Sequence, residues 1–286
     1  MLVIDRNILA DGFALSHDIE DYPEGLVISL DKPWRWTSAD VIRKVKFAAA
    51  RHFGKKKLKV GHAGTLDPLA TGVLLICIGN ATKQAQALQD HDKEYVAGIS
   101  FGATTPSYDL EKDIDRMFPY DGVTEESVRA ALPAFIGEQE QIAPLFSAKS
   151  VDGVRAYEMA RRMYRASSGE GDFDRTAAEM LHRSVITIYD AELLSFSAHG
   201  RPAERKGEDM DVKGRINYSD TSALGLPHAD IRISCSKGTY IRAFARDLGE
   251  ALGTGAHLDG LRRSATGRFR AEDSVTLPQA LSLFGV

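Results

Sequence analysis

The sequence predicts a chain of the α/β (α+β) class, combining strands and helices, on three observations. Short apolar runs recur, the longest being the six residues 73–78, and runs of this length between turn residues are typical of buried strands. Other stretches begin at a helix-capping residue and end at glycine. The composition, 43% hydrophobic and 27% charged, is that of an ordinary globular protein, and 286 residues suffice for one large domain or two small ones.

The N-terminal elements follow from local patterns. Residues 1–24 are acidic and show little periodicity, so we interpret them as an extension that packs loosely. The apolar segment 26–30 is the first expected strand. A helix is expected over 39–45, because Thr37 or Ser38 is a good N-cap for its free backbone N–H groups.

The remaining elements are predicted by the same signals: apolar or β-branched runs for strands, caps and glycine stops for helices, and polar clusters for loops. In chain order they are a strand at 73–78, a strand at 95–101, a polar loop at 102–109, a helix at 124–135 stopped by Gly137, a strand, a turn and a helix start over 147–157, a strand at 184–196, a strand at 231–235, and a helix at 240–252 stopped by Gly253. The polar, glycine-rich segment 198–227 is interpreted as an insertion between two strands.

The most informative segment is residues 61–72, which read Gly-His-Ala-Gly-Thr-Leu-Asp-Pro-Leu-Ala-Thr-Gly. Three glycines and a proline exclude a regular helix or strand interior here, because glycine costs backbone entropy and proline lacks an N–H donor. Asp67 is therefore expected in a shaped loop at a sheet edge, directly before a buried strand, where reacting side chains are often placed. For an isolated Asp-Pro pair, an Asx-type turn would be the simpler interpretation.

The segment resembles the catalytic motif Gly-His-x-Gly-x-Leu-Asp-Pro-x-Ala-x-Gly of the bacterial TruB family of pseudouridine synthases. Further motifs of that family follow in the right order. Upstream, Lys32-Pro33 and Thr37-Ser38 match the motif Lys-Pro-x-Gly-x-Thr-Ser, except that Arg35 stands where the family has glycine. The downstream matches are Asp92-Lys93-Glu94-Tyr95, Ser236-Lys237-Gly238-Thr239-Tyr240-Ile241-Arg242, and Leu261-Arg262-Arg263 with Gly267-Arg268-Phe269.

The resemblance spans roughly residues 25–283, nearly the whole chain. It implies a catalytic domain over 25–286 with the pseudouridine synthase fold, a mixed, mostly antiparallel central sheet with flanking helices. Many family members carry a small C-terminal RNA-binding domain of the PUA type. We do not expect that domain here, because Val286 follows shortly after the core motifs.

The resemblance also implies roles for individual residues. Asp67 is the nucleophile, Arg242 pairs with it, and Tyr95 stacks on the target base and handles a proton. His62 fills the gap left when the base leaves the RNA stack. The other expected substrate contacts are Lys32, Lys83, Tyr240 and Leu261. Without the resemblance, Tyr95 would be interpreted as a core aromatic at a strand edge, and His62 as a loop histidine bonded to backbone groups.

These residue types suit the implied reaction, which isomerises the T-loop uridine at position fifty-five of tRNA to pseudouridine. The C1′–N1 glycosidic bond breaks, the base turns, and a C1′–C5 bond forms. A carboxylate can attack the anomeric carbon or stabilise positive charge on it, and an arginine contact favours the ionised carboxylate. Loss of the C5 proton needs a base or a relay, for which Tyr95 is the candidate. No cofactor is required.

Two other classes of function are weighed against this one. An aspartyl-phosphate enzyme would need an acidic metal-binding cluster, and a glycosidase would need a second carboxylate. Neither lies close to Asp67 in the sequence, although Asp109 or Asp247 could approach it in space. A non-catalytic RNA-binding module would most simply show a changed Asp67, Tyr95 or Arg242, and all three are present.

The net charge is −4, yet basic residues are concentrated beside the Asp67 loop. From Arg43 to Lys59 there are eight Lys or Arg and no Asp or Glu. A local basic face is what phosphate contacts need, although the three lysines at 55–57 alone would be interpreted as a solvated turn. The residues expected to face the RNA backbone are Arg43, Lys44, Lys55, Lys56, Lys57, Lys59, Arg262 and Arg263.

The sequence shows no signal peptide, no apolar run of membrane-spanning length and no metal-ligand spacing. Its two cysteines, Cys77 and Cys235, fall in expected strands and are interpreted as buried thiols of a reducing compartment. We therefore expect a cytoplasmic monomer that binds the T-arm of tRNA, without a metal, a cofactor or a membrane partner.

Overall fold

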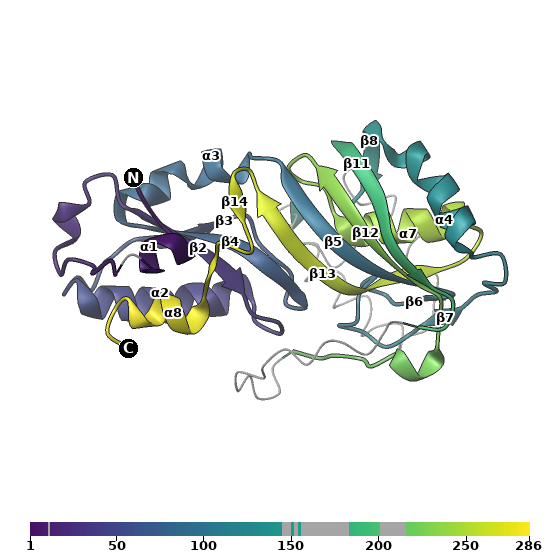
Figure 1. The fold of residues 1–286 in the computed structure, drawn as a ribbon, viewed down its shortest axis with the longest axis horizontal. Coiled ribbons are helices and arrows are strands. Elements are labelled where there is room, and N and C mark those ends of the chain that lie inside the picture. The colour runs from purple at the N-terminus through teal and green to yellow at the C-terminus, as the bar shows by residue number, and fades with distance from the viewer. Residues whose placement is uncertain (11, 145–149, 152–153, 156–182, 201–215) are drawn as a thin grey trace. The chain divides into compact units, whose positions relative to one another are not determined.

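The computed structural model describes the chain except for residues 11, 145–149, 152–153, 156–182 and 201–215 (Figure 1). The chain divides into two compact units. Unit 1 is made of Met1–Tyr95, Lys206–Ile216 and Arg262–Val286, and unit 2 is made of Val96–Arg205 and Asn217–Leu261.

Unit 1 is built on a mixed sheet with the strand order β1-β2-β4-β13-β5. Strand β4 pairs antiparallel with β2 and with β3, whereas the short strands β1 and β15 lie parallel to β2. Strand β14 pairs antiparallel with β13. The bounds are β1 (Leu2–Ile4), β2 (Leu26–Lys32), β3 (Val60–Ala63), β4 (Ala70–Ile78), β5 (Lys93–Phe101), β13 (Ala256–Thr266), β14 (Phe269–Arg270) and β15 (Val275–Thr276).

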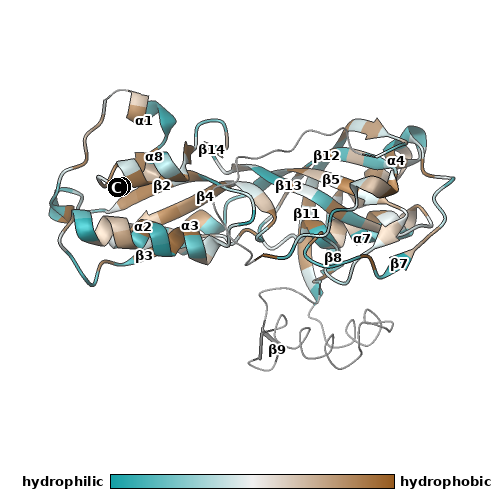
Figure 2. Cartoon of the chain, turned by 90° about the horizontal axis from the view of Figure 1, so that it is seen from below, coloured by the Kyte–Doolittle hydropathy of each residue, from teal (hydrophilic) through white to brown (hydrophobic). Residues whose placement is uncertain are grey.

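Strands β2 and β4 form the apolar centre of unit 1 and confirm the strands expected at 26–30 and 73–78 (Figure 2). Every residue from Gly72 to Ile78 is buried, and each buried Val, Leu or Ile side chain favours folding by about 1.5–3 kcal/mol relative to an exposed one. The register pairs Lys32 with Gly72. Strand β2 therefore delivers Lys32 to the base of the loop that precedes β4.

The helices of unit 1 begin where the sequence supplies a cap. The helix expected from 39 is confirmed as α2, whose N-cap Thr37 accepts a hydrogen bond from the backbone N–H of Asp40. Its buried residues recur every three or four positions, so one face packs inward while the other faces solvent. Helix α8 packs beside α2 (Figure 1). The bounds are α1 (Arg6–Ala10), η1 (Ile19–Asp21), α2 (Ser38–His52), η2 (Gly79–Gln84), α3 (Ala85–Gln89) and α8 (Leu277–Ser282).

The expectation that residues 1–24 pack loosely is wrong. Residues Leu2–Ile4 form a parallel edge strand on β2, and the Ile4 side chain is fully buried. Leu15 and Ile19 are buried as well. Asp18, Glu20, Asp21 and Glu24 are exposed. Their charges dominate the composition of the segment, so the few apolar residues that anchor it are hard to recognise from sequence.

The expectation that residues 61–72 contain no strand is also wrong at both ends of the segment. Gly61 and His62 lie in β3, and Gly72 lies in β4, so the loop itself is only 64–69. Glycine is needed in β4 because Gly72 has φ +102 and a Cβ there would lie 2.2 Å from the backbone oxygen of Arg263. A glycine inside a strand commonly marks such a close backbone approach.

Unit 2 has the strand order β13-β5-β12-β11-β8, to which β5 contributes residues 96–101 and β13 residues 256–261. Strand β11 pairs antiparallel with both of its neighbours. The bounds are β8 (Gly137–Ile142), β11 (Arg183–Ser197), β12 (His228–Cys235), the two-stranded sheets β6 (Ala103–Thr104) with β7 (Arg116–Met117) and β9 (Ser150–Val151) with β10 (Val154–Arg155), and the helices α4 (Glu125–Ala131), η3 (Leu132–Phe135), η4 (Ser222–Leu224) and α7 (Ile241–Ala251). Phe135 of η3 packs edge-on against Phe244 of α7, with ring centroids 5.2 Å apart.

Most expectations for unit 2 are confirmed. Strands β5, β11 and β12 lie where the apolar runs place them. Cys235 is a buried free thiol in β12, as Cys77 is in β4 of unit 1. The helix expected at 124–135 is α4 followed by η3, capped by Thr124, and α7 matches the helix expected at 240–252.

Two expectations for unit 2 fall partly or wholly at residues that the structure leaves out. Ser150–Val151 confirms part of the expected strand, whereas Val154–Arg155 is a short strand, so the helix start expected there is wrong. The rest of that prediction, at 147–149, 152–153 and 156–157, lies outside the described residues. The segment interpreted as an insertion joins β11 to β12, but its residues 201–215 also lie outside the described part. None of the described helices combines the length and the apolar character that crossing a membrane requires.

Candidate active site

Asp67 lies in the loop 64–69, which joins β3 to β4 in unit 1. Its side chain is half-buried, and its backbone carbonyl accepts a hydrogen bond from the N–H of Ala70 (3.1 Å), which closes the turn into β4. Gly64 has φ +89, a conformation that favours glycine. Leu66 is buried beneath the loop. The carboxylate is thus carried by a short loop anchored on a fully buried strand.

Two side chains hold this loop, one from the last residue of β2 and one from the first residue of α2. The hydroxyl of Ser38 donates to the carbonyl of Leu66 (3.1 Å) and accepts from its N–H (3.0 Å). The fully buried ammonium group of Lys32 donates to the carbonyl of Pro68 (3.1 Å). It also donates to the carbonyls of Pro33 (3.0 Å) and Trp36 (2.5 Å). Lys32, which the sequence marks as a substrate contact, therefore has a definite structural task.

Arg263 holds the loop from the other side. Its guanidinium donates from Nε to the carbonyl of Val73 (2.7 Å) and from Nη2 to the carbonyl of Gly64 (3.1 Å). Only 1% of Arg263 is exposed. The prediction that Arg263 faces the RNA backbone is therefore wrong, because its charge is committed to main-chain carbonyls inside unit 1. The burial of Arg263 cannot be recognised from the Arg262-Arg263 pair alone. Neighbouring side chains of a strand point to opposite faces, and only the structure shows which of the two points inward.

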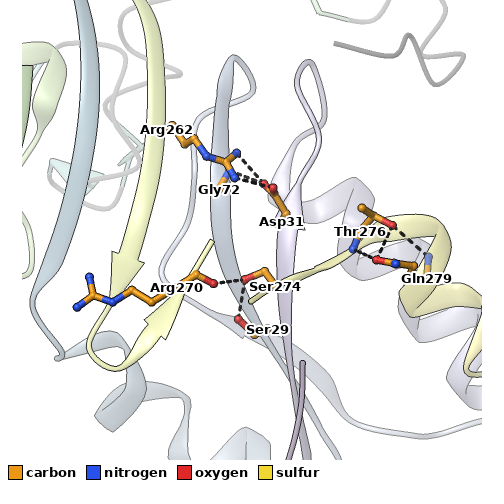
Figure 3. A network of polar contacts seen from close by, with 8 residues as sticks. All are labelled: Ser29, Asp31, Gly72, Arg262, Arg270, Ser274, Thr276 and Gln279. Atoms are coloured by element: carbon orange, nitrogen blue, oxygen red, sulfur yellow. Dashed lines mark hydrogen bonds and ion pairs between the residues drawn. The ribbon is translucent and has the colours of Figure 1, made fainter. Parts of the chain in front are cut away.

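The neighbouring Arg262 makes a separate polar network (Figure 3). It pairs with the carboxylate of Asp31 through two hydrogen bonds of 3.1 and 2.7 Å, and the N–H of Gly72 donates to the same carboxylate (3.0 Å). Arg262 is 38% exposed in its side chain, so its predicted RNA contact stays a prediction. In the same network, the hydroxyls of Ser274 and Ser29 share a hydrogen bond of 2.8 Å. The hydroxyl of Ser274 also donates to the carbonyl of Arg270 (2.8 Å).

His62 lies on β3, two residues before the loop 64–69 begins. Burial lowers the pKa of His62, and the nearby positive charge of Arg263 lowers it further. Its Nδ1 atom is buried and has no hydrogen-bond partner among the described residues. Both effects on the pKa favour the neutral form of the imidazole, which costs less to bury than the charged form. The predicted role of His62 as gap-filler stays a prediction.

Tyr95 lies on β5, also in unit 1, and is 8% exposed. It shares its side of the strand with the buried residues Lys93 and Ala97, which follows the alternation of a strand. Burial suits both the core role and the predicted stacking role, so the assignment stays a prediction.

Arg242 stands in the first turn of α7 in unit 2 and is 4% exposed. Its Nη1 donates to the carbonyl of Ser107 (3.1 Å), and its Nε lies 3.7 Å from the carboxylate of Asp109. Asp109 is itself buried, and the sequence offers no local signal for this pairing because 133 residues separate the two. The predicted pairing of Arg242 with Asp67 joins residues of different units and stays a prediction.

The remaining expected substrate contacts are spread over both units. Tyr240 precedes α7, and its backbone N–H donates to the side chain of Gln141 (2.8 Å). Leu261 is partly buried on β13, and Lys83 is exposed on η2. Their substrate contacts stay predictions.

Arg35, which departs from the family motif, has φ +60. This left-handed conformation explains the family's glycine, since a non-glycine residue there costs of order 1–3 kcal/mol. The side chain offsets part of that cost: its Nη2 donates to the carbonyl of Ile216 (2.8 Å), and its guanidinium lies 5.5 Å from the ring centre of Trp34.

The basic residues of α2 and the following turn are exposed, and their contact with the RNA backbone stays a prediction. Two carboxylates that lie outside or at the edge of the run pair with them: Asp40 with Arg43 (2.9 Å) and Glu20 with Lys55. The other exposed members are Lys44, Lys46, Arg51, Lys56, Lys57 and Lys59. In the described part of the chain, no cluster of three His, Cys, Asp or Glu has the arrangement to hold a metal ion.

Comparison with family models gives two matches. Residues 51–199 match the model of the TruB family pseudouridylate synthase N-terminal domain, and residues 242–284 match that of the tRNA pseudouridylate synthase B C-terminal domain. The first contains the Asp67 loop and Tyr95, and the second begins at Arg242 and contains Arg263.

Curated relatives match over most of their length. The chain is 45% identical over 260 residues to the tRNA pseudouridine synthase B of Phocaeicola vulgatus, which covers 90% of this chain and 92% of the relative. It is 37% identical over 262 residues to the protein of the same name from Flavobacterium johnsoniae, covering 90% and 95%.

Among solved structures, a chain of a Cbf5-Nop10-Gar1 complex superposes with a TM-score of 0.57 and 27% identity. The match covers 92% of this chain and 56% of the solved one, so this chain spans a little over half of that protein. A chain of the archaeal box H/ACA sRNP Nop10-Cbf5 complex matches with a TM-score of 0.53 and 25% identity, covering 91% and 54%. These likenesses confirm the predicted fold, a mixed and mostly antiparallel sheet with flanking helices.

Proposed function

Because the chain belongs to the TruB family of pseudouridylate synthases, we propose that it isomerises the uridine at position fifty-five in the T-loop of tRNA, with Asp67 as the nucleophile. The family resemblance noted in the sequence is confirmed. The chain is a tRNA pseudouridine synthase, an isomerase that forms pseudouridine in the T-loop. What we propose beyond this is which residues carry the reaction and which uridine of the T-loop is the target.

The reaction is balanced within the substrate. The C1′–N1 bond breaks, the uracil turns, and C5 bonds to C1′, while the proton leaves C5 and N1 takes up a proton. In the proposal, the Asp67 carboxylate supplies an electron pair at the reacting centre or stabilises positive charge that develops there. Tyr95 stacks on the base and relays the C5 proton, and no external oxidant or cofactor enters the balance.

The supporting observation is the way the loop 64–69 is held. Three side chains that do not belong to the loop, Lys32, Ser38 and Arg263, all bond to its backbone or to the first residues of β4, and none of these bonds uses the Asp67 carboxylate. Bonds to the backbone fix the loop that carries the carboxylate, and a firmly held loop is what a positioned nucleophile needs. Arg242 is proposed to favour the ionised carboxylate when substrate is bound.

The proposed RNA contacts are electrostatic. The exposed Lys and Arg of α2 and of 55–59 precede β3 directly, so they lie on the unit that carries Asp67. Phosphate groups of the T-arm are the matching partners, and their binding is expected to weaken as salt rises.

The experiment is tritium release from an unmodified tRNA transcript labelled at C5 of uridine. The wild-type protein is expected to release about one tritium per tRNA, and Asp67→Asn is expected to bind tRNA but release none, because loss of an essential nucleophile removes most of the rate. Asp121→Asn, which neutralises an exposed carboxylate of unit 2, is the matched control and should behave like the wild type.

Two results would contradict the proposal. An Asp67→Asn rate above about a hundredth of the wild-type rate would remove the nucleophile assignment. Tight tRNA binding by a wild type that releases no tritium would favour an RNA-remodelling role instead.

A further inference from the structure

Arg263 contacts the start of the loop that carries Asp67 and the strand β4 that follows the loop. Its guanidinium bonds to the carbonyl of Gly64, where the loop begins, and to the carbonyl of Val73, four residues after the loop ends at Leu69. Its backbone lies against Gly72, where a Cβ would come within 2.2 Å of the Arg263 carbonyl oxygen. One residue of β13 therefore touches the loop's N-terminal end and the strand that follows it.

The electrostatic setting of Arg263 is unusual. A buried charge is expensive unless it is paired, and buried arginines are mostly paired with carboxylates. The two hydrogen bonds of the Arg263 side chain go to main-chain carbonyls, and no carboxylate among the described residues forms an ion pair with it. The neighbouring Arg262 does pair with a carboxylate, that of Asp31. Retaining an unpaired buried charge needs a reason other than stability.

The fork shape of the guanidinium supplies that reason. Two N–H groups of one planar, rigid group fix two carbonyls relative to each other, which a lysine ammonium on a flexible stem does far less well. The two carbonyls belong to Gly64 and Val73. The Arg263 guanidinium therefore fixes the distance between the start of the loop and β4, in the hairpin that β3 and β4 form. Ser38 and Lys32 then hold the middle of the loop, at Leu66 and Pro68.

We propose that Arg263 is a positioning residue for the reaction: it fixes the loop 64–69 so that the Asp67 carboxylate is presented at the correct place. The inference rests on the proposed function, in which Asp67 is the nucleophile. Arg263 does not touch the substrate. Its charge also helps to keep His62 neutral, because burial and Arg263 together lower the pKa of that histidine.

The test uses the full-length protein with Arg263→Met, which removes both bonds and the charge, and Arg263→Lys, which keeps the charge but loses the fork. The matched control is Ile4→Ala, which empties a fully buried site on β1 of the same unit and lowers stability without touching the loop. The measurements are the single-turnover rate with saturating enzyme, the Kd for tRNA, the melting temperature and the NMR titration of His62.

We expect the single-turnover rate to fall about 100-fold in Arg263→Met and about tenfold in Arg263→Lys, since a misplacement of about 1 Å can cost a factor of about 100. The Kd for tRNA should stay within about threefold, because the side chain is buried. The His62 titration midpoint should rise in Arg263→Met and stay unchanged in Ile4→Ala. Ile4→Ala should keep the wild-type rate below its melting temperature.

The opposite results would overturn the inference. Folded Arg263 variants that react within about threefold of the wild type would show that the fork is not needed. A weaker Kd with an unchanged rate would make Arg263 an RNA contact instead. If Arg263→Met does not fold, the single-turnover rate of Arg263→Lys decides whether the inference stands. An inactive wild type would refute the proposed function rather than this inference, so the two failures are distinguishable.

Discussion

Two polar loops of the molecule are held in opposite ways. The loop 64–69 in unit 1 is held by side chains that lie 28, 36 and 199 residues away in the sequence, those of Ser38, Lys32 and Arg263. The segment 105–109 in unit 2 is held largely by its own side chains. Thr105 donates to the carbonyl of Asp109 (2.7 Å), and Ser107 donates to the Asp109 carboxylate (2.6 Å).

The difference indicates what each loop is for. A loop closed by its own Ser and Asp residues keeps its shape wherever it is placed, and in unit 2 it presents the Ser107 carbonyl and the Asp109 carboxylate to Arg242. A loop held from outside takes its position from the whole unit. The second arrangement suits a reacting group, because its position relative to other elements matters more than its local shape.

The largest expected effect concerns Gly72, where the strand of the Asp67 loop meets Arg263. Gly72→Ala should lower the free energy of unfolding by about 3 kcal/mol or more, because φ is +102 and the new Cβ would lie 2.2 Å from a backbone oxygen. Gly61→Ala in the same motif has no heavy atom within 4 Å and should change it by less than about 1 kcal/mol. Urea unfolding measures both, and equal midpoints for the two variants would contradict the packing argument.

A smaller effect compares the two loops directly. Ser38→Ala leaves the buried N–H and carbonyl of Leu66 without a partner, so it should cost about 1–3 kcal/mol and slow single turnover about tenfold. Ser107→Ala removes one of several bonds to Asp109, and the N–H of Glu111 still donates to that carboxylate (3.0 Å). It should cost about 1 kcal/mol and change the rate less than about threefold. Similar rate losses in both variants would remove the distinction between the loops.

The smallest effect concerns one histidine in each unit. Burial and Arg263 lower the pKa of His62 below its ordinary value of 6.5. For His228, burial alone would lower the pKa, but the carboxylates of Asp230 (3.4 Å) and Asp259 (2.6 Å) outweigh burial and raise it. An NMR titration should therefore give midpoints on opposite sides of 6.5.

The two histidines should also change stability with opposite sign. The contribution of His228 is fully present below pH 6.5 and is lost as the pH rises through its raised folded value. The contribution of His62 is present above pH 6.5 and is lost as the pH falls toward its lowered folded value. His228→Gln should flatten the decline above pH 6.5, and an unchanged pH profile of unfolding would refute the charged pairing of His228.

Local signals predicted the elements of the fold well. Thr37 and Thr124 cap their helices because their hydroxyls accept from free N–H groups, and Gly137 and Gly253 have positive φ after the helices that they were expected to end. Buried strands were recognised from their apolar runs. The strand at Leu2–Ile4 was missed, because a three-residue strand in an acidic segment has too short a pattern to be recognised without its partner β2.

The sequence by itself determined the family, the Asp67 motif, the strands β2, β4, β5, β11 and β12 and the helices α2, α4 and α7, because these depend on residue identity, spacing and local backbone preference. The tertiary structure alone decided which arginine of the pair 262–263 turns inward, why Gly72 must be glycine, and that Asp109 lies beside Arg242. Each of these depends on two segments that lie 130 or more residues apart in the chain, and no local pattern encodes which of many possible partners a folded chain brings into contact.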